Sequence, residues 1–119
     1  MIKDISAFEA NDLVNENLDN PDFAILDLRT AVEFKRGHIK NAINLDYYLD
    51  TFEAELQKID KFKTYLVYCK TGNRSDLAMD LFRKFEFSDI YHLSDGIVEW
   101  KDEGYEIAKP AKVEEFEED

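Results

Sequence analysis

Short apolar runs alternate with helix-like segments along this chain, and this alternation limits the folds that it can adopt. The apolar runs predicted as strands are residues 3–5, 23–26, 42–45, 65–68 and 90–93. Strands separated by helices typically pair in parallel, because each helical crossover returns the chain to the same end of the sheet. We therefore expect an α/β fold with a mostly parallel five-stranded sheet and helices on both faces.

The helix-like segments carry start and stop signals. Ser6 with Glu9, and Thr30 with Glu33, fit the capping box, in which a hydroxyl and a carboxylate satisfy each other's backbone N–H groups. The helix that starts after Thr30 is expected to stop at Gly37. Further helices are predicted over residues 51–59, after Ser75, and over residues 98–103.

The composition fits one acidic domain. The chain has 119 residues, of which 45% are apolar, and this is enough to bury one core but not two. Its 27 acidic and 15 basic residues give a net charge of −12, which opposes binding to nucleic acids and to anionic lipid. We predict a domain over residues 1–110 and a mobile acidic tail over residues 111–119.

The expected compartment is the cytoplasm. No stretch approaches the roughly 18 apolar residues of a membrane helix, and the first residues begin no signal-peptide core. Cys69 is the only cysteine, so an internal disulfide is impossible, which suits a reducing compartment.

Cys69 stands where the apolar run 65–68 opens into a short polar loop before a helix. Backbone N–H groups of such a loop can converge on one point as an anion-binding nest, and the helix start adds its dipole. Lys70 and Arg74 bring two positive charges near this point, and Gly72 permits a tight turn with positive φ. Together these features favour the nucleophilic thiolate of Cys69 over an inert buried thiol.

Three motifs resemble those of the rhodanese superfamily. The first is the loop Cys69-Lys70-Thr71-Gly72-Asn73-Arg74-Ser75, similar to the pattern Cys-x-x-Gly-x-Arg-Ser. The second lies in residues 27–45, with Asp27-Leu28-Arg29, Glu33-Phe34, Gly37-His38-Ile39 and Ala42-Ile43-Asn44. The third is Ser94-Asp95-Gly96 followed by Trp100, in which Asp95 replaces the first glycine of the family's pair.

The resemblance implies a single rhodanese-like domain that acts as a sulfurtransferase without a cofactor. Cys69 would attack the outer sulfur of thiosulfate, a polysulfide or a donor persulfide and hold it as a persulfide. Cyanide, a thiol or a protein partner in a sulfur relay would then remove this sulfur. The loop expected to bind the persulfide comprises Lys70, Thr71, Gly72, Asn73, Arg74 and Ser75.

The length of the loop separates two kinds of enzyme. Four residues lie between Cys69 and Arg74, whereas thiol phosphatases and arsenate reductases have five. A phosphoryl group needs a wide ring of N–H donors, while a terminal persulfide sulfur is one compact anion, so the short loop favours sulfur transfer. A binding module that keeps the fold without turnover remains an alternative, because a fold does not guarantee activity. A phosphatase or arsenate reductase is a less favoured one.

Asp27, Arg29 and Arg36 are candidates to support the site. Arg29 or Arg36 could attract an anionic substrate while Asp27 fixes an arginine, although we favour a purely structural tie between the strand end and a nearby loop. The helix cap is explanation enough for Glu33. Neither of the two histidines is predicted to be catalytic, and His38 is expected to bond backbone groups. The sequence contains no metal-ligand spacing, so no metal is predicted.

Overall fold

The computed structural model describes residues 1–110, and the predicted tail of residues 111–119 lies outside the described residues. Strands and helices alternate from the start of the chain to residue 102. The strands are β1 (Ile2–Ile5), β2 (Phe23–Asp27), β3 (Ile43–Asn44), β4 (Thr64–Tyr68) and β5 (Asp89–Leu93). The helices are α1 (Ala7–Glu16), α2 (Ala31–Arg36), α3 (Phe52–Lys58), α4 (Asn73–Lys84) and α5 (Gly96–Asp102).

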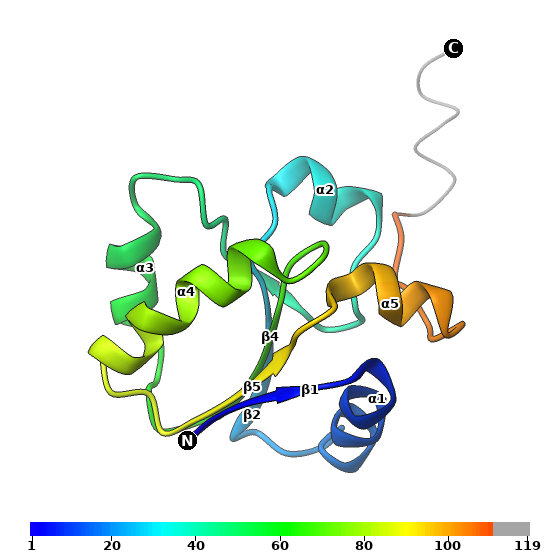
Figure 1. Ribbon diagram of the computed structural model, residues 1–119, viewed down its shortest axis with the longest axis horizontal. Helices are drawn as coiled ribbons and strands as arrows, with labels where there is room; N and C mark the ends of the chain where they lie inside the picture. Colours follow the sequence, from blue (N-terminus) through cyan, green and yellow to red (C-terminus); the bar gives the residue numbers. More distant parts are fainter. Residues whose placement is uncertain (111–119) are drawn as a thin grey trace.

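The five strands form one parallel sheet in the order β1-β5-β4-β2-β3 (Figure 1). β4 is the central strand, and its residues 65–68 are all buried. A strand that is covered on both faces has no solvent-facing side, which explains its unbroken apolar run. The predicted α/β fold, with a five-stranded parallel sheet and helices on both faces, is confirmed.

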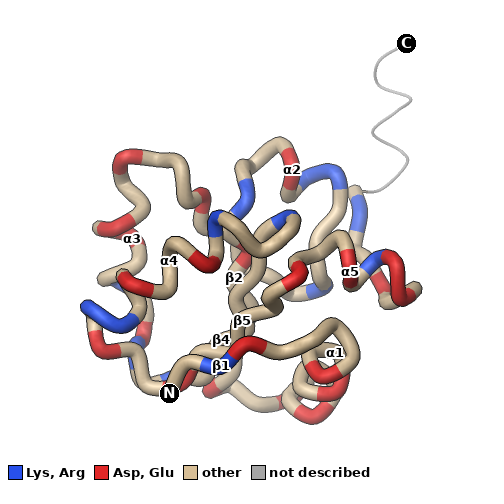
Figure 2. The backbone as a smooth tube through the Cα atoms, in the orientation of Figure 1, with Lys and Arg blue, Asp and Glu red and all other residues tan. Residues whose placement is uncertain are grey.

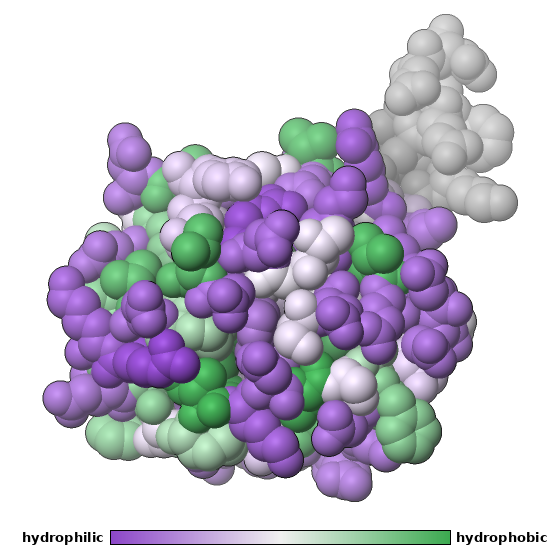
Figure 3. Space-filling model, in the orientation of Figure 1, coloured by the Kyte–Doolittle hydropathy of each residue, from purple (hydrophilic) through white to green (hydrophobic). Residues whose placement is uncertain are grey.

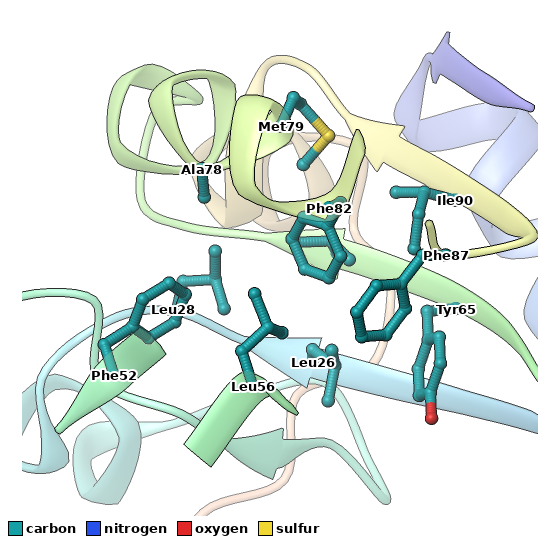
Figure 4. Packing of buried hydrophobic residues seen from close by; sticks show 11 residues of the cluster. Leu26, Leu28, Phe52, Leu56, Tyr65, Ala78, Met79, Phe82, Phe87 and Ile90 are labelled. Carbon is teal, nitrogen blue, oxygen red and sulfur yellow. The ribbon is translucent and has the colours of Figure 1, made fainter. Parts of the chain in front are cut away.

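Four of the five helices cover the two faces of the sheet in pairs. α3 and α4 lie on one face, and α1 and α5 lie on the other (Figure 1). The core under α3 and α4 receives Phe52, Leu56, Ala78, Met79 and Phe82 from these helices (Figure 4). The opposite core receives Ala7, Ala10, Ile97 and Trp100 from α1 and α5. Burial of both cores fixes the positions of the strands. It therefore also fixes the end of β4, where Cys69 lies.

Both predicted capping boxes are present. Glu9 donates its backbone N–H to the Ser6 Oγ at 3.2 Å, and Glu33 donates its backbone N–H to the Thr30 Oγ1 at 3.3 Å. In each box the glutamate side chain accepts the N–H of the cap residue in return. α2 ends immediately before Gly37, as predicted. Start and stop signals in the sequence therefore determine these helix ends locally.

The bounds of several elements differ from the sequence prediction, and for three elements the structure shows the reason. β3 has two residues rather than four, because it is an edge strand and Asn41, with φ of 70°, turns the chain just before it. α4 begins at Asn73 and α5 at Gly96, in each case earlier than predicted. Gly72 and Gly96 adopt φ of 103° and 70°, so the chain turns from loop into helix at the glycine itself.

One face of the molecule is largely polar. Figure 3 shows hydrophilic side chains over most of the face in view, with apolar side chains in separate small patches. Within residues 1–110, no helix is both long and apolar enough to span a bilayer. In Figure 2, acidic residues are frequent along α1 and α3, whereas basic residues occur around the start of α4 and in α2. The carboxyl ends of the central strands thus carry positive charge on an otherwise acidic protein.

Candidate active site at the end of strand β4

Cys69 follows β4 directly, and its side chain is buried. The backbone N–H groups of Gly72 and Ser75 donate to its sulfur at 3.2 and 3.4 Å. The Ser75 Oγ lies 3.3 Å from the same sulfur. Because α4 begins at Asn73, the Ser75 N–H belongs to its first turn and is free to point at the thiol. The structure thus brings Cys69, Gly72 and Ser75 together in a cradle that stabilises negative charge on sulfur.

The start of α5 holds this loop in place through backbone contacts. Ile97 and Val98 donate their backbone N–H groups to the carbonyl oxygens of Cys69 and Lys70, at 3.0 and 3.1 Å. A Cβ atom added at Gly96 would overlap the Lys70 carbonyl oxygen, and one added at Gly72 would overlap the Ser94 carbonyl oxygen. The two turns therefore pack backbone against backbone, and each needs a glycine at the contact.

Asp95 replaces a family glycine without distorting this turn. Its φ is −99°, in the region that any residue adopts, whereas the positive φ falls on the next residue, Gly96. Only the second glycine of the family's pair is therefore required by the backbone here.

The Cys69 sulfur is the end of a chain of polar contacts that crosses two strands. The Ser75 Oγ lies 2.6 Å from the His92 Nε2, and the His92 Nδ1 lies 3.0 Å from the Asp4 Oδ1. Ser75 and His92 are buried, whereas Asp4 is exposed at the edge of the sheet. The sequence prediction missed the link between His92 and the loop. The available signal was a histidine in a buried strand, since a buried imidazole needs hydrogen-bond partners.

Arg74 is bound by a residue of α2. Its Nη1 and Nη2 donate to the two carboxylate oxygens of Glu33 at 2.7 and 3.0 Å. Its guanidinium also lies over the ring of Tyr48, 5.4 Å from the centroid. The expectation that the helix cap alone explains Glu33 is wrong, because the same carboxylate also anchors the cysteine loop to α2. Residues 41 positions apart make this contact, so local sequence could not reveal it.

The Arg74 hydrogen bonds lower the pKa of Glu33 from 4.5 to about 2. We therefore expect Glu33→Gln to reduce the free energy of unfolding at pH 7 by about 1 to 2 kcal/mol, since a charge-assisted pair is lost. Glutamine keeps the capping-box acceptor, so the change removes mainly the charge. A lowered pKa stabilises the fold above pH 4.5, and this contribution disappears as the pH falls towards 2.

Urea unfolding of both proteins between pH 7 and pH 2 measures this effect. The matched control is Glu55→Gln, which breaks the exposed pair with Lys58 and should change the free energy of unfolding by less than about 0.5 kcal/mol. A difference between native protein and Glu33→Gln that stays constant down to pH 2 would contradict the predicted role of the Glu33 charge.

Asp27 and Arg29 form a buried ion pair beside the cradle. The Arg29 Nη2 lies 2.7 Å from the Asp27 Oδ2 and also donates to the Gly37 carbonyl oxygen at 2.6 Å. The Arg29 backbone N–H donates to the Asp27 Oδ1 at 2.9 Å, which closes the turn after β2. The Arg29 side chain thus ties the end of β2 to the loop at Gly37. The register pairs Asp27 with Tyr68, so both strand ends lie on the same rim.

A small pocket beside the loop is lined mainly by basic side chains. Arg29, Arg36, Lys70 and Lys101 contribute to it, together with Glu33 and two apolar residues of α5. Arg36 and Lys70 are exposed, whereas Arg29 is buried and held by its ion pair. Thr71 and Asn73, the other predicted loop residues, have exposed side chains. Of the supporting candidates, Arg36 is thus the arginine whose side chain is open to solvent.

His38 contacts backbone groups, as predicted. Its Nδ1 lies 2.9 Å from the Phe34 carbonyl oxygen, and its ring stacks on the Phe34 ring with 3.7 Å between centroids. Among the described residues, no group of three or more His, Cys, Asp and Glu side chains could hold a metal ion.

Residues 10–103 match the family described as the Rhodanese-like domain, and this match covers most of the chain. The chain belongs to the rhodanese-like domain family. Its fold resembles a rhodanese-related protein from Thermoplasma volcanium, with a TM-score of 0.75 and 27% identity over 91% of this chain and 99% of that one. It also resembles the polysulfide-sulfur transferase homodimer from Wolinella succinogenes, with a TM-score of 0.72 and 29% identity over 93% and 81% of the chains.

Among sequence relatives, the rhodanese domain is similar to tRNA uridine(34) hydroxylases. It is 33% identical to the one from Photorhabdus laumondii over 83% of this chain, and 31% identical to the one from Cronobacter sakazakii over 92%. The chain spans only 29% and 35% of the length of these two relatives. It therefore corresponds to one part of these longer proteins.

Proposed function

We propose that this rhodanese domain is a sulfurtransferase that carries a sulfane sulfur on Cys69. The observation that supports this function most is the set of two N–H groups and one hydroxyl within 3.4 Å of the Cys69 sulfur. Preorganised donors of this kind stabilise charge that develops during a reaction. They can stabilise the thiolate before sulfur transfer and the terminal sulfur of a persulfide anion after it.

The proposed cycle has two substitutions at sulfur. The Cys69 thiolate attacks the outer sulfur of thiosulfate, a new S–S bond forms, and sulfite leaves with the electron pair of the broken S–S bond. A thiolate or cyanide then attacks the outer sulfur of the Cys69 persulfide, and the Cys69 thiolate leaves. Neither step needs an oxidant, a metal or an organic cofactor. The result is a ping-pong cycle with a covalent enzyme intermediate.

The charges at the site favour an anionic sulfur donor. The protein carries a net charge of −12, yet four of the side chains that line the pocket to which Lys70 of the loop contributes are basic. A local positive field of this kind attracts small anions such as thiosulfate or polysulfide. The resemblance to the Wolinella polysulfide-sulfur transferase agrees with this donor class. The acceptor would be a thiol, cyanide or a protein of a sulfur relay, in a reducing compartment such as the cytoplasm.

Direct action on tRNA has less support in this chain. The relatives named tRNA uridine(34) hydroxylase are about three times as long as the matched region. The net charge of −12 opposes contact with a phosphate backbone. Both observations favour sulfur transfer over hydroxylation of tRNA as the function of this chain.

Intact-mass measurement after incubation with thiosulfate or polysulfide tests the proposal. The native protein should gain the mass of one sulfur atom, cyanide should remove it, and Cys69→Ser should gain nothing. A native protein that never acquires sulfur would instead support the binding-module alternative. Hydrolysis of an aryl phosphate through Cys69, without any sulfur gain, would support the phosphatase alternative.

The two cations of the loop should have different roles. Arg74→Lys retains the charge but cannot form the two-point pair with Glu33, so we expect kcat to fall about tenfold. Lys70→Ala removes an exposed charge and should raise KM about two- to fivefold at low salt, with the difference shrinking as salt is added.

Steady-state kinetics with thiosulfate at two salt concentrations measure both effects. Lys61→Ala is the matched control, because Lys61 is also exposed but precedes β4 at the opposite end of the strand. Equal and salt-insensitive effects from Arg74→Lys and Lys70→Ala would show that these roles are wrongly assigned.

A further inference from the structure

The Ser75 hydroxyl has more acceptors around it than protons to donate. Its oxygen lies 2.6 Å from the His92 Nε2, 3.2 Å from the Gly72 carbonyl oxygen and 3.3 Å from the Cys69 sulfur. A hydroxyl has one hydrogen, so only one of these three groups can receive it at a time. The shortest contact is the one to His92. The protonation state of His92 therefore decides whether Ser75 can donate to Cys69.

Asp4 determines which nitrogen of the neutral His92 ring carries the hydrogen. The Asp4 Oδ1 lies 3.0 Å from the His92 Nδ1, and an ionised carboxylate can only accept. The hydrogen of the neutral ring is therefore on Nδ1, and Nε2 accepts from Ser75. In the doubly protonated ring, Nε2–H donates to the Ser75 oxygen instead. The Ser75 hydrogen is then free to bind the Cys69 thiolate.

Within residues 1–110, the charged contact of His92 is the one to Asp4. Asp4 is the only carboxylate within 4 Å of its ring nitrogens among the described residues. In the sheet register, His92 lies between Asp4 on β1 and the apolar Val67 on β4. From α4 the contact is Ser75, and Cys69, at the end of β4, lies one hydrogen bond further.

We propose that Ser75, His92 and Asp4 form a proton relay that activates Cys69. The thiol proton passes to the Ser75 oxygen while the Ser75 hydroxyl proton passes to the His92 Nε2. The products are a thiolate that accepts a hydrogen bond from Ser75 and an imidazolium that is paired with Asp4. Each of two protons has crossed one hydrogen bond, so one proton is transferred in net from the thiol to His92 and the total charge is unchanged. The arrangement follows the general logic of a nucleophile, a base and a group that orients the base.

In this relay His92 and Asp4 are positioning residues, because they reach the reacting sulfur only through Ser75. The inference rests on the proposed nucleophilic role of Cys69. Its test uses the rate of Cys69 alkylation by iodoacetamide against pH, which needs no sulfur donor. Failure of the relay and failure of sulfur transfer are therefore separate outcomes.

His92→Gln keeps a polar side chain in the strand but cannot take up a proton. We expect the midpoint of the alkylation profile to rise by about one pH unit, which is a tenfold loss of thiolate below that midpoint. Asp4→Asn should also raise the midpoint of the alkylation profile, by about half a pH unit, because the imidazolium loses its counter-charge. The plateau rate at high pH should not change, since the thiolate itself is the same.

Asp12→Asn is the matched control for Asp4. It also neutralises an exposed aspartate, but on α1, which covers the opposite face of the sheet from α4, and should leave the midpoint where it is. An altered plateau rate with an unaltered midpoint in His92→Gln would show a merely structural role and overturn the relay. Equal midpoints in native protein, His92→Gln and Asp4→Asn would overturn it as well.

If His92→Gln does not fold, the relay can be tested by titrating His92 itself in proteins that retain it. In long-range ¹H–¹⁵N spectra, the titration midpoint of His92 should be lower in Cys69→Ser than in the native protein, because coupling between two groups is reciprocal. His38, bonded to a backbone carbonyl, should not shift and serves as the internal control. Identical His92 titrations in both proteins would exclude the relay.

Discussion

Insertion of one glycine between Gly72 and Asn73 should lower sulfur transfer from thiosulfate by a factor of about a hundred or more. In the native loop, the N–H of Gly72 and the N–H of Ser75 converge on the Cys69 sulfur from the two sides of this junction. One additional residue separates them, so both cannot remain within hydrogen-bond distance of one atom. The persulfide then loses charge stabilisation, as when a donor of an oxyanion hole is removed.

The control is a glycine inserted between Asp19 and Asn20. Both residues are exposed in the turn before β2, at the end of the parallel sheet opposite to Cys69. This insertion should leave sulfur transfer within about twofold of native, because surface loops tolerate added residues. Phosphate-ester activity should be assayed in parallel, since a wider ring can hold a tetrahedral oxyanion. Full sulfur transfer by the loop insertion would refute the argument from loop length.

The second large effect is expected from Gly72→Ala. Gly72 adopts φ of 103°, and a Cβ there would overlap the Ser94 carbonyl oxygen, which is backbone and cannot rotate away. The turn must move, and the N–H that donates to Cys69 moves with it. We expect sulfur transfer to fall about a hundredfold and the free energy of unfolding to fall by about 3 kcal/mol or more.

Gly104→Ala is the control for Gly72→Ala. It distinguishes the effect of the Cβ overlap with Ser94 from the effect of a positive φ alone. Gly104 has φ of 84°, but an added Cβ there meets no atom within 4 Å. This variant should lose only about 1 kcal/mol of unfolding free energy and keep its activity. Urea unfolding and thiosulfate turnover of the two variants give the comparison. Equal losses in both would mean that the contact with Ser94 has no effect of its own.

Local patterns in the sequence were sufficient for most of the fold. Alternating strands and helices predicted the parallel sheet, and both capping boxes at Ser6 and Thr30 are present. The errors lie where a boundary depends on more than local preference. α4 begins three residues earlier than predicted and α5 two residues earlier, because the loop of Cys69 and the turn at Gly96 pack against each other and both turn at glycine.

The sequence also located the thiol and its cradle. Cys69 lies between a buried strand and a helix start, in a loop with a glycine. This local pattern places the thiol near backbone N–H groups, independently of the rest of the chain. This information is contained in one continuous segment, residues 65–75. The motif could therefore be interpreted without knowing which strands are neighbours.

Only the tertiary structure decided which distant side chains support the loop. Glu33 reaches Arg74 across 41 positions, His92 reaches Ser75 across 17, and Asp4 reaches His92 across 88. These contacts depend on the strand order β1-β5-β4-β2-β3, which places β5 between β1 and β4. Hydrophobic periodicity determines which face of a strand is buried but not which strand lies beside it. The sequence alone thus determined the position of the thiol and its cradle, and the packing of the sheet determined the groups that hold the cradle and reach this thiol.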